Sequence, residues 1–154
     1  YELTQDLTGE AGLPAYEISN HAIPSQESRH NLIYWQAGDW VAVGPGAHGR
    51  LSTRSGRMAT EAIRAPGAWL DAVETAGSGE SSRSALSTTE AWEEAVMMGL
   101  RLTDGIDLSR FNQINHNKIN ALVGACLLDV TAEKFRATPK GRPVLNYILR
   151  ELLV

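Results

Sequence analysis

The residues with the greatest capacity for chemistry lie between positions 16 and 50 of this 154-residue sequence. Three of the four histidines lie in this stretch, namely His21, His30 and His48. An imidazole can ligate a metal or a haem iron, or it can transfer protons. His30 and Asn31 precede Tyr34 and Trp35, so one short segment offers both an axial ligand and the flat aromatic surface that a haem site requires. The alternative is that His30 and Asn31 hydrogen-bond to the backbone of a loop while the two aromatic side chains fill the core.

A glycine-rich turn follows a short apolar run in the same stretch. Residues 40–43 read Trp-Val-Ala-Val, which predicts a β-strand covered on both faces. Residues 44–49 continue directly as Gly-Pro-Gly-Ala-His-Gly. Glycines at such a place allow positive φ angles and let a ligand approach backbone N–H groups closely. The turn is therefore a candidate cofactor rim, and a tight turn that merely needs glycine is the alternative.

Three motifs follow one another here: residues 16–20 read YEISN, residues 30–35 read HNLIYW and residues 43–49 read VGPGAHG. In this order and spacing they resemble the C-terminal third of the oxygen-independent coproporphyrinogen III oxidase family. The resemblance is closer to its radical SAM haem-chaperone branch, with its HNxxYW motif and GxGPGAHS turn, and it covers essentially the whole chain. Gly49 stands where that family usually has serine, which removes one possible hydrogen bond to a ligand. His21 stands where phenylalanine is usual.

The resemblance implies a full-length protein that holds S-adenosylmethionine and a 4Fe–4S cluster and binds haem or a porphyrin for delivery to haem-receiving proteins. It implies cofactor-binding roles for two sets of residues, His30, Asn31, Tyr34 and Trp35 for haem and Gly44, Gly46, Ala47 and His48 near the adenosyl pocket. The cluster needs three cysteines, and the chain has one, Cys126, which is expected to be a small buried side chain. We therefore expect the cluster ligands upstream, in a longer protein. None of these cofactors should be held stably by this chain alone, which is expected to be inactive in radical chemistry.

Two further interpretations stay open. Within the same family, the parent protein would be a decarboxylating oxidase of coproporphyrinogen III, although the HNxxYW motif favours the chaperone branch. In a different class, the chain would be a non-catalytic winged-helix interaction module. In each of these interpretations no catalytic residue is assigned to this chain, and apart from the candidate haem contacts no metal ligand is assigned, since the iron–sulfur ligands are expected elsewhere.

Charge and hydropathy exclude other classes of partner. The formal net charge is −4 with no basic block, which disfavours a nucleic-acid binder. No apolar run approaches the roughly 20 residues of a membrane-spanning helix, so no integral membrane segment is predicted. A single cysteine excludes an internal disulfide and fits a reducing, cytoplasmic environment.

The first half of the chain predicts short mixed elements. A helix ends near Gly12, and a strand is expected at residues 15–19. Ser55-Gly56 between two alternating runs predicts a β-hairpin over residues 50–61, and Pro66 suits the first turn of a helix over residues 65–76. Residues 77–85 are small and polar, which predicts a linker and a domain boundary.

The second half predicts a helical unit. Ser87 and Glu90 form a capping box for a helix that extends to about Leu102. Asp107 is expected to cap a second helix, and residues 115–127 to form a third with Ile119, Leu122, Val123 and Cys126 facing inward. Residues 130–138 are expected to hold two short strands, and Pro139 to begin a last helix that extends through Leu153. These elements together predict a winged-helix-like domain. Lys118 is the only cation of the third helix, which again disfavours DNA binding.

The predicted fold class is therefore α/β plus α. Residues 1–76 would be the terminal strands of an incomplete TIM-like radical SAM barrel with an appended hairpin and helix. Residues 86–154 would be the winged-helix-like C-terminal domain. A strand edge cut from a barrel invites pairing with a second copy, so a homodimer of this chain is a further prediction.

Overall fold

The computed structural model describes residues 1–107 and 115–153, whose contacts form two compact units. One unit combines residues 1–37 with 92–154, and the other comprises residues 38–91. These units do not divide at residues 77–85. The assignment of residues 1–76 to a barrel and 86–154 to a winged-helix-like domain stays a prediction. The apolar positions of the helix predicted after Asp107, namely Leu108, Phe111 and Ile114, lie outside the described residues.

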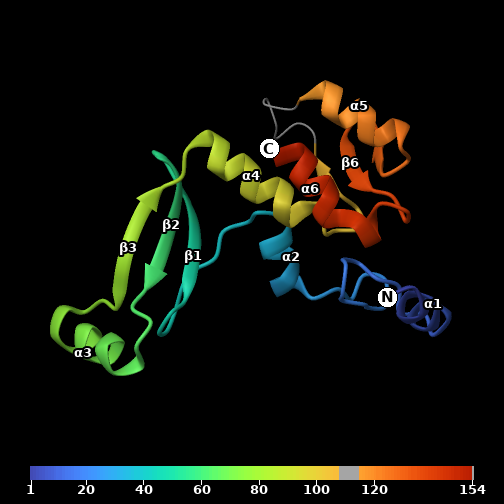
Figure 1. Ribbon diagram of the computed structural model, residues 1–154. Helices are drawn as coiled ribbons and strands as arrows, with labels where there is room; N and C mark the ends of the chain where they lie inside the picture. Colours follow the sequence, from blue (N-terminus) through green and yellow to red (C-terminus); the bar gives the residue numbers. More distant parts are fainter. Residues whose placement is uncertain (108–114, 154) are drawn as a thin grey trace. The chain divides into compact units, whose positions relative to one another are not determined.

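The unit of residues 38–91 is built on a three-stranded antiparallel sheet of order β1-β2-β3 (Figure 1). Its strands are β1 (His48–Thr53), β2 (Gly56–Ala62) and β3 (Glu80–Ala85). The predicted hairpin is confirmed, and Gly56 at its turn has a φ of 120°. The predicted helix is also confirmed as α3 (Pro66–Ala76), which has proline in its first turn and ends at Gly77 in the left-handed conformation.

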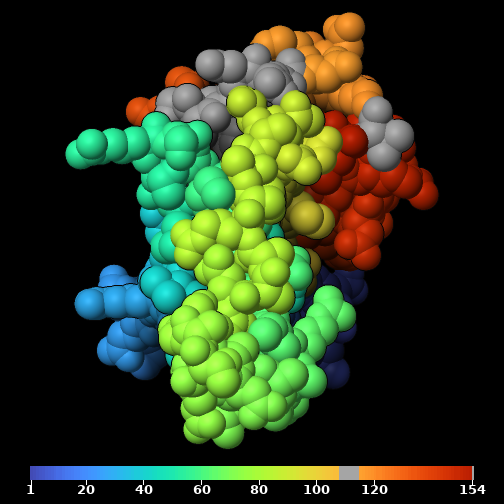
Figure 2. Space-filling view, turned by 90° about the vertical axis from the view of Figure 1, so that its left-hand side faces the viewer, coloured from blue at the N-terminus to red at the C-terminus, as the bar shows by residue number. Residues whose placement is uncertain are grey.

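The predicted linker is wrong, because residues 80–85 form β3 rather than unpaired chain. Its polar sequence has little intrinsic preference for a strand. Pairing with β2 supplies the backbone hydrogen bonds, and the pairs run from Met58 opposite Ala85 to Ala62 opposite Glu80. All six residues of β3 are exposed, and Figure 2 shows this yellow-green segment at the surface facing the viewer.

The predicted strand at residues 40–43 is also wrong. Only Trp40 pairs, in an isolated bridge with Arg50. Val41 and Val43 are 70% and 82% exposed, whereas Trp40 and Ala42 are half-buried, so this run is not covered on both faces within the described chain. An apolar composition favours a strand only where a neighbouring strand completes the ladder, and here the pairing with β1 stops at the single Trp40–Arg50 bridge.

The second unit is mainly helical. Its helices are α1 (Glu2–Glu10), α2 (Arg29–Trp35), most of α4 (Thr88–Gly99), α5 (His116–Gly124) and α6 (Leu145–Leu153). A small antiparallel sheet of order β4-β6-β5 comprises Ile106–Asp107, Lys134–Ala137 and Leu128–Val130. The last helix does not begin at Pro139 as predicted, because a 3₁₀ turn over Arg142–Val144 precedes it and α6 begins at Leu145. The core joins the sheet to α4, α5 and α6 through Val96, Leu100, Ile106, Leu122, Leu128, Phe135, Ala137, Leu145 and Ile148.

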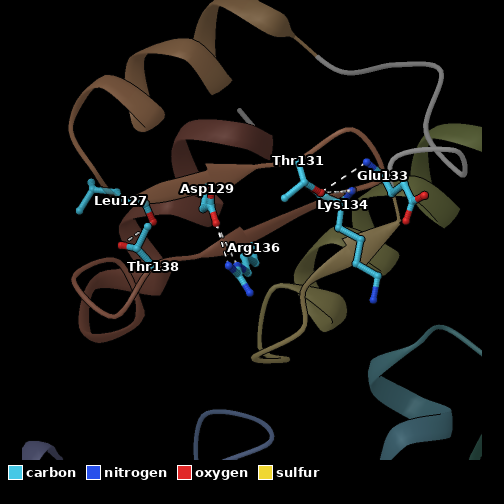
Figure 3. A network of polar contacts seen from close by, with 7 residues as sticks. All are labelled: Leu127, Asp129, Thr131, Glu133, Lys134, Arg136 and Thr138. Atoms are coloured by element: carbon cyan, nitrogen blue, oxygen red, sulfur yellow. Dashed lines mark hydrogen bonds and ion pairs between the residues drawn. The ribbon is translucent and has the colours of Figure 1, made fainter.

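Local signals place several of these elements as predicted. The capping box is confirmed, because the backbone N–H of Glu90 donates to the Ser87 hydroxyl at 3.1 Å and the Ser87 N–H donates to the Glu90 carboxylate at 2.8 Å. Helix α4 ends at Gly99 rather than Leu102. Two short strands are present near residues 130–138 as predicted, but the first, β5, begins earlier, at Leu128, and pairs with β6. Arg136 and Asp129 form an ion pair at 2.9 Å across this hairpin (Figure 3).

Two predictions in this unit are wrong. Residues 15–19 form a loop closed by an isolated bridge between Ala15 and His21, because Glu17 bonds within the loop instead of extending a ladder. Cys126 is exposed rather than buried. It lies beyond the end of α5 with a φ of 59°, so the helical phase that would turn its side chain inward has already ended. Val123, also predicted to face inward, lies within α5 and is 38% exposed.

Candidate functional site

The segment HNLIYW folds as most of helix α2. Ser28 caps the helix by accepting a hydrogen bond from the N–H of Asn31 at 3.4 Å, and the chain turns away after Trp35 through Ala37, which has a φ of 50°. In an α-helix, residues four positions apart lie on the same face. His30 and Tyr34 therefore stand one above the other.

His30 and Tyr34 form the clearest pair of the candidate haem segment. His30 Nε2 lies 2.9 Å from the Tyr34 hydroxyl, and the two rings meet edge to face with centroids 4.8 Å apart. The His30 side chain is exposed. The pair presents an imidazole at the surface with an aromatic ring held against it, which is a geometry that an axial ligand can use.

Asn31 and Trp35 link this helix to other parts of the same unit. Asn31 Nδ2 donates to the hydroxyl of Tyr16 at 3.1 Å, so the first motif contacts the second. The guanidinium of Arg101 lies over the Trp35 ring, 5.0 Å from its centroid. The indole Nε1 of Trp35 is buried and has no hydrogen-bond partner among the described residues. The Asn31 side chain therefore hydrogen-bonds to another side chain rather than to the backbone. The indole N–H of Trp35 is a donor without an acceptor among the described residues.

The first motif positions a buried carboxylate that the sequence reading did not single out. Glu17 is fully buried, and its Oε1 accepts from the Ser19 N–H at 2.7 Å, the Ser19 hydroxyl at 3.0 Å and Asn20 Nδ2 at 2.7 Å. Burial raises the pKa of the Glu17 carboxyl, but the hydrogen bonds from Ser19 and Asn20 outweigh it and bring the pKa below its ordinary value. Serine and asparagine at two and three positions after a glutamate are the signal that could have predicted this turn.

The glycine turn lies in the other unit. Gly44 and Gly46 have φ angles of 99° and 69°, so both need glycine. The N–H of Gly46 donates to Ile63 at 2.9 Å, and the N–H of Ala47 donates to Gly44 at 3.3 Å. These two N–H groups therefore already donate hydrogen bonds within the protein and are not available to a ligand. A ligand at this turn would contact chiefly the backbone around Gly44.

His48 begins β1 beside the turn. Its Nδ1 lies 3.7 Å from the Glu61 carboxylate across the hairpin, with both side chains about half exposed. The backbone carbonyl of His48 accepts from the indole Nε1 of Trp40 at 2.7 Å. A hollow of about 190 Å³ lies near the turn, with Val43, Gly44 and Trp69 among its lining residues. The role of His48, like those of the other candidate residues, stays a prediction.

Other candidate groups give less support for a site. His21 Nε2 is buried and has no partner among the described residues, while His116 is exposed at the start of α5. Within residues 1–107 and 115–153, no group of three or more His, Cys, Asp or Glu side chains could hold a metal ion. One cysteine cannot supply the thiolates of a 4Fe–4S cluster, so the residues of this chain do not fit that group. No helix in the described part is long and apolar enough to cross a membrane.

The chain is similar in sequence to known proteins over nearly its whole length. Residues 86–144 match the family described as the HemN C-terminal domain. The chain is 30% identical over 153 residues to the heme chaperone HemW of Mycobacterium tuberculosis, covering 99% of this chain and 38% of that protein. It is 33% identical over 171 residues to the mitochondrial radical S-adenosyl methionine domain-containing protein 1 of Bos taurus, again covering 99% and 38%.

The fold has a counterpart among solved structures. The structure of coproporphyrinogen III oxidase (HemN) from Escherichia coli, a radical SAM enzyme, superposes with a TM-score of 0.69, covering 97% of this chain and 39% of that one. The sequence identity is 14%, so this match concerns the fold alone. The chain spans less than half the length of the curated relatives and the solved structure that it matches.

Proposed function

Because the chain belongs with the C-terminal part of HemW/HemN-type radical SAM proteins, we propose that it serves a haem chaperone. In the full-length protein it would help to bind haem before delivery to haem-receiving proteins. The segment of α2 that carries His30 would supply the haem contacts. S-adenosylmethionine and the 4Fe–4S cluster would be held largely by the part of the protein outside this chain.

The observation that carries this proposal is the exposed His30–Tyr34 pair on α2. Haem iron can take an imidazole nitrogen as an axial ligand, and contacts with aromatic side chains stabilise binding of the flat macrocycle. Asn31 and Trp35 would complete the contact surface, with Asn31 fixed by Tyr16 and Trp35 beneath Arg101. The chaperone is favoured over the decarboxylating oxidase because this chain carries the HNxxYW pattern of the chaperone branch.

The glycine turn would form part of the adenosyl pocket in the complete protein. Gly44 offers backbone with no side chain, Gly46 and Ala47 shape the turn, and His48 lies at its edge. The exposed side chains of Val41 and Val43 fit a run that pairs with further strands of a longer barrel. Residues 1–76 would then be the barrel end and the region from residue 86 the C-terminal domain. A cytoplasmic setting and self-association of the isolated chain are further parts of this proposal.

A haem titration of the full-length protein tests the proposal. The wild-type protein is expected to shift the Soret band of haem, and His30→Ala is expected to weaken binding by at least about tenfold because an axial ligand is lost. His116→Ala is the matched control, since His116 is an exposed histidine of α5 in the same unit. An unchanged Soret spectrum in His30→Ala would reject the role of this helix. Anaerobic conversion of coproporphyrinogen III to protoporphyrinogen would favour the oxidase instead.

A further inference from the structure

Two arginines line one hollow of about 400 Å³ in the unit formed by residues 1–37 and 92–154. Arg101 follows helix α4, and Arg142 begins the 3₁₀ turn before α6. Ile18 and Leu145 contribute apolar surface, and Asn146 adds an amide. The described residues that line the hollow include no carboxylate. The hollow therefore combines two positive charges with a partly apolar wall.

Arg142 is fixed in place by the protein. Its Nη2 donates to the carbonyl oxygen of Glu17 at 2.7 Å, and its Nη1 donates to the Thr103 hydroxyl at 2.9 Å. The Nε atom is buried and has no hydrogen-bond partner among the described residues. A rigidly held guanidinium thus keeps one donor unsatisfied.

The guanidinium of Arg101 has fewer hydrogen-bond partners than that of Arg142. Its guanidinium lies over the ring of Trp35, and its Nε is also buried without a partner in the described part of the chain. No ion pair joins the side chain of Arg101 or Arg142 to the Glu17 carboxylate in that part. Glu17 Oε1 accepts from Ser19 and Asn20, and its buried Oε2 also has no hydrogen-bond partner among the described residues. A buried N–H without an acceptor is costly, and two such donors on arginines of one hollow indicate a missing acceptor.

We propose that Arg101 and Arg142 form an oxyanion site that takes a carboxylate or phosphate group. Guanidinium groups suit these ligands because their planar set of N–H donors matches two oxygens at once. One source rests on the proposed function: haem carries propionate carboxylates, and Arg101 stacks on Trp35 of the candidate haem segment. The other source is a free phosphate or small carboxylate.

The test compares dissociation constants of the full-length protein for haem, haem dimethyl ester and inorganic phosphate. The ester keeps the macrocycle and the iron but has no free carboxylate. Arg101→Gln is the informative variant, because the Arg101 side chain makes no hydrogen bond to the described residues whose loss would disturb the fold, whereas Arg142 also holds Glu17 and Thr103. Arg101→Lys tests charge without the planar donors. Arg150→Gln is the control, since Arg150 also lies over an aromatic ring, that of Tyr147 at 5.7 Å, and does not line the hollow.

Wild-type protein and Arg150→Gln should bind haem at least about tenfold more tightly than the ester, and Arg101→Gln should lose this difference. Arg101→Lys should recover part of the difference. Equal binding of haem and ester, together with phosphate binding that Arg101→Gln abolishes, would support the site with a free oxyanion as its ligand. If the wild-type protein bound no haem, the proposed function would fail, and the phosphate measurement alone would decide the oxyanion site. Wild-type affinity of Arg101→Gln for all three ligands would overturn the inference.

Discussion

Arg142 donates a hydrogen bond to the carbonyl oxygen of Glu17 across 125 positions of the sequence. The same guanidinium donates to the hydroxyl of Thr103, whose own hydroxyl donates to the carbonyl of Ala15 at 2.9 Å. The N–H of Thr103 completes the connection by donating to Tyr16 at 3.0 Å. The YEISN loop is therefore attached to Thr103 and Arg142, two residues of the region that matches the HemN C-terminal domain.

Replacement of Arg142 should destabilise the chain. Arg142→Ala removes two hydrogen bonds from a charged donor and leaves the acceptor of Glu17 in a poorly solvated place, so the free energy of unfolding should fall by about 2–3 kcal/mol. Urea denaturation monitored by circular dichroism measures this change. Arg150→Ala, at an exposed position of α6, should change the free energy of unfolding by less than about 0.5 kcal/mol. Equal stability of the two variants would contradict the role given to Arg142.

The buried carboxylate of Glu17 should make stability depend on acid pH. Its folded-state pKa lies below the ordinary value of 4.5, although burial alone would raise it, because Ser19 and Asn20 hydrogen-bond to the ionised form. The resulting stabilisation is fully present above the unfolded-state pKa and is lost as the pH falls below about 4.5 toward the folded-state pKa. The difference in free energy of unfolding between wild type and Glu17→Gln should therefore be largest near pH 7. It should shrink steadily as the titration is carried below pH 4.5, and a difference independent of pH would count against this account.

Gly49 should not tolerate the serine that the resembled family usually has at this place. A Cβ atom built on Gly49 would lie 2.5 Å from the Thr60 hydroxyl oxygen, 2.9 Å from the Ala42 nitrogen and 3.1 Å from the Trp40 carbonyl oxygen. Two of these neighbours are backbone and cannot move cheaply, so Gly49→Ser should reduce the free energy of unfolding by about 1–3 kcal/mol.

A matched glycine checks the steric argument for Gly49. Gly67 in α3 has nothing within 4 Å of the corresponding position. Gly67→Ala should be neutral or stabilising by up to about 1 kcal/mol, because alanine favours a helix over glycine. Thermal unfolding of both variants measures the contrast, and a neutral Gly49→Ser would show that the hairpin can rearrange around the new side chain.

Sequence reasoning succeeded where the determining signal is local. Ser55-Gly56 fixes the β1–β2 hairpin, Pro66 begins α3, and Ser87 with Glu90 caps α4. It failed where pairing across the chain decides the outcome. The polar residues 80–85 become a strand because β2 offers them a ladder, and the apolar residues 40–43 do not because none is offered beyond Trp40.

In the candidate site, too, contacts between neighbouring residues could be predicted from the sequence and contacts between distant residues could not. The His30–Tyr34 contact follows from a spacing of four once α2 is known to be a helix, and that helix was too short to predict from periodicity. The contacts of Trp35 with Arg101 and of Glu17 with Arg142 join distant positions, so no local pattern indicates them. The unpartnered Nε atoms of the two arginines become visible only when burial is known.

The Tyr34 hydroxyl should compete with haem iron for His30. Its oxygen lies 2.9 Å from His30 Nε2, so iron can bind that nitrogen only after the hydrogen bond is broken. Tyr34→Phe removes the competing group and keeps an aromatic ring at the same place. Since a typical hydrogen bond contributes about 0.5–1.5 kcal/mol, haem affinity of the full-length protein should rise about two- to tenfold.

Two further variants help to identify which nitrogen of His30 binds the haem iron. Tyr34→Ala also removes the ring and should lower haem affinity, while Tyr16→Phe removes the bond to Asn31 without touching His30 and should leave the Soret position unchanged. A fall in affinity for Tyr34→Phe would instead point to Nδ1 as the ligand, because the Tyr34 hydroxyl would then be holding the imidazole in the required tautomer. Equal affinities of Tyr34→Phe and wild type would show that the hydrogen bond is absent when haem approaches.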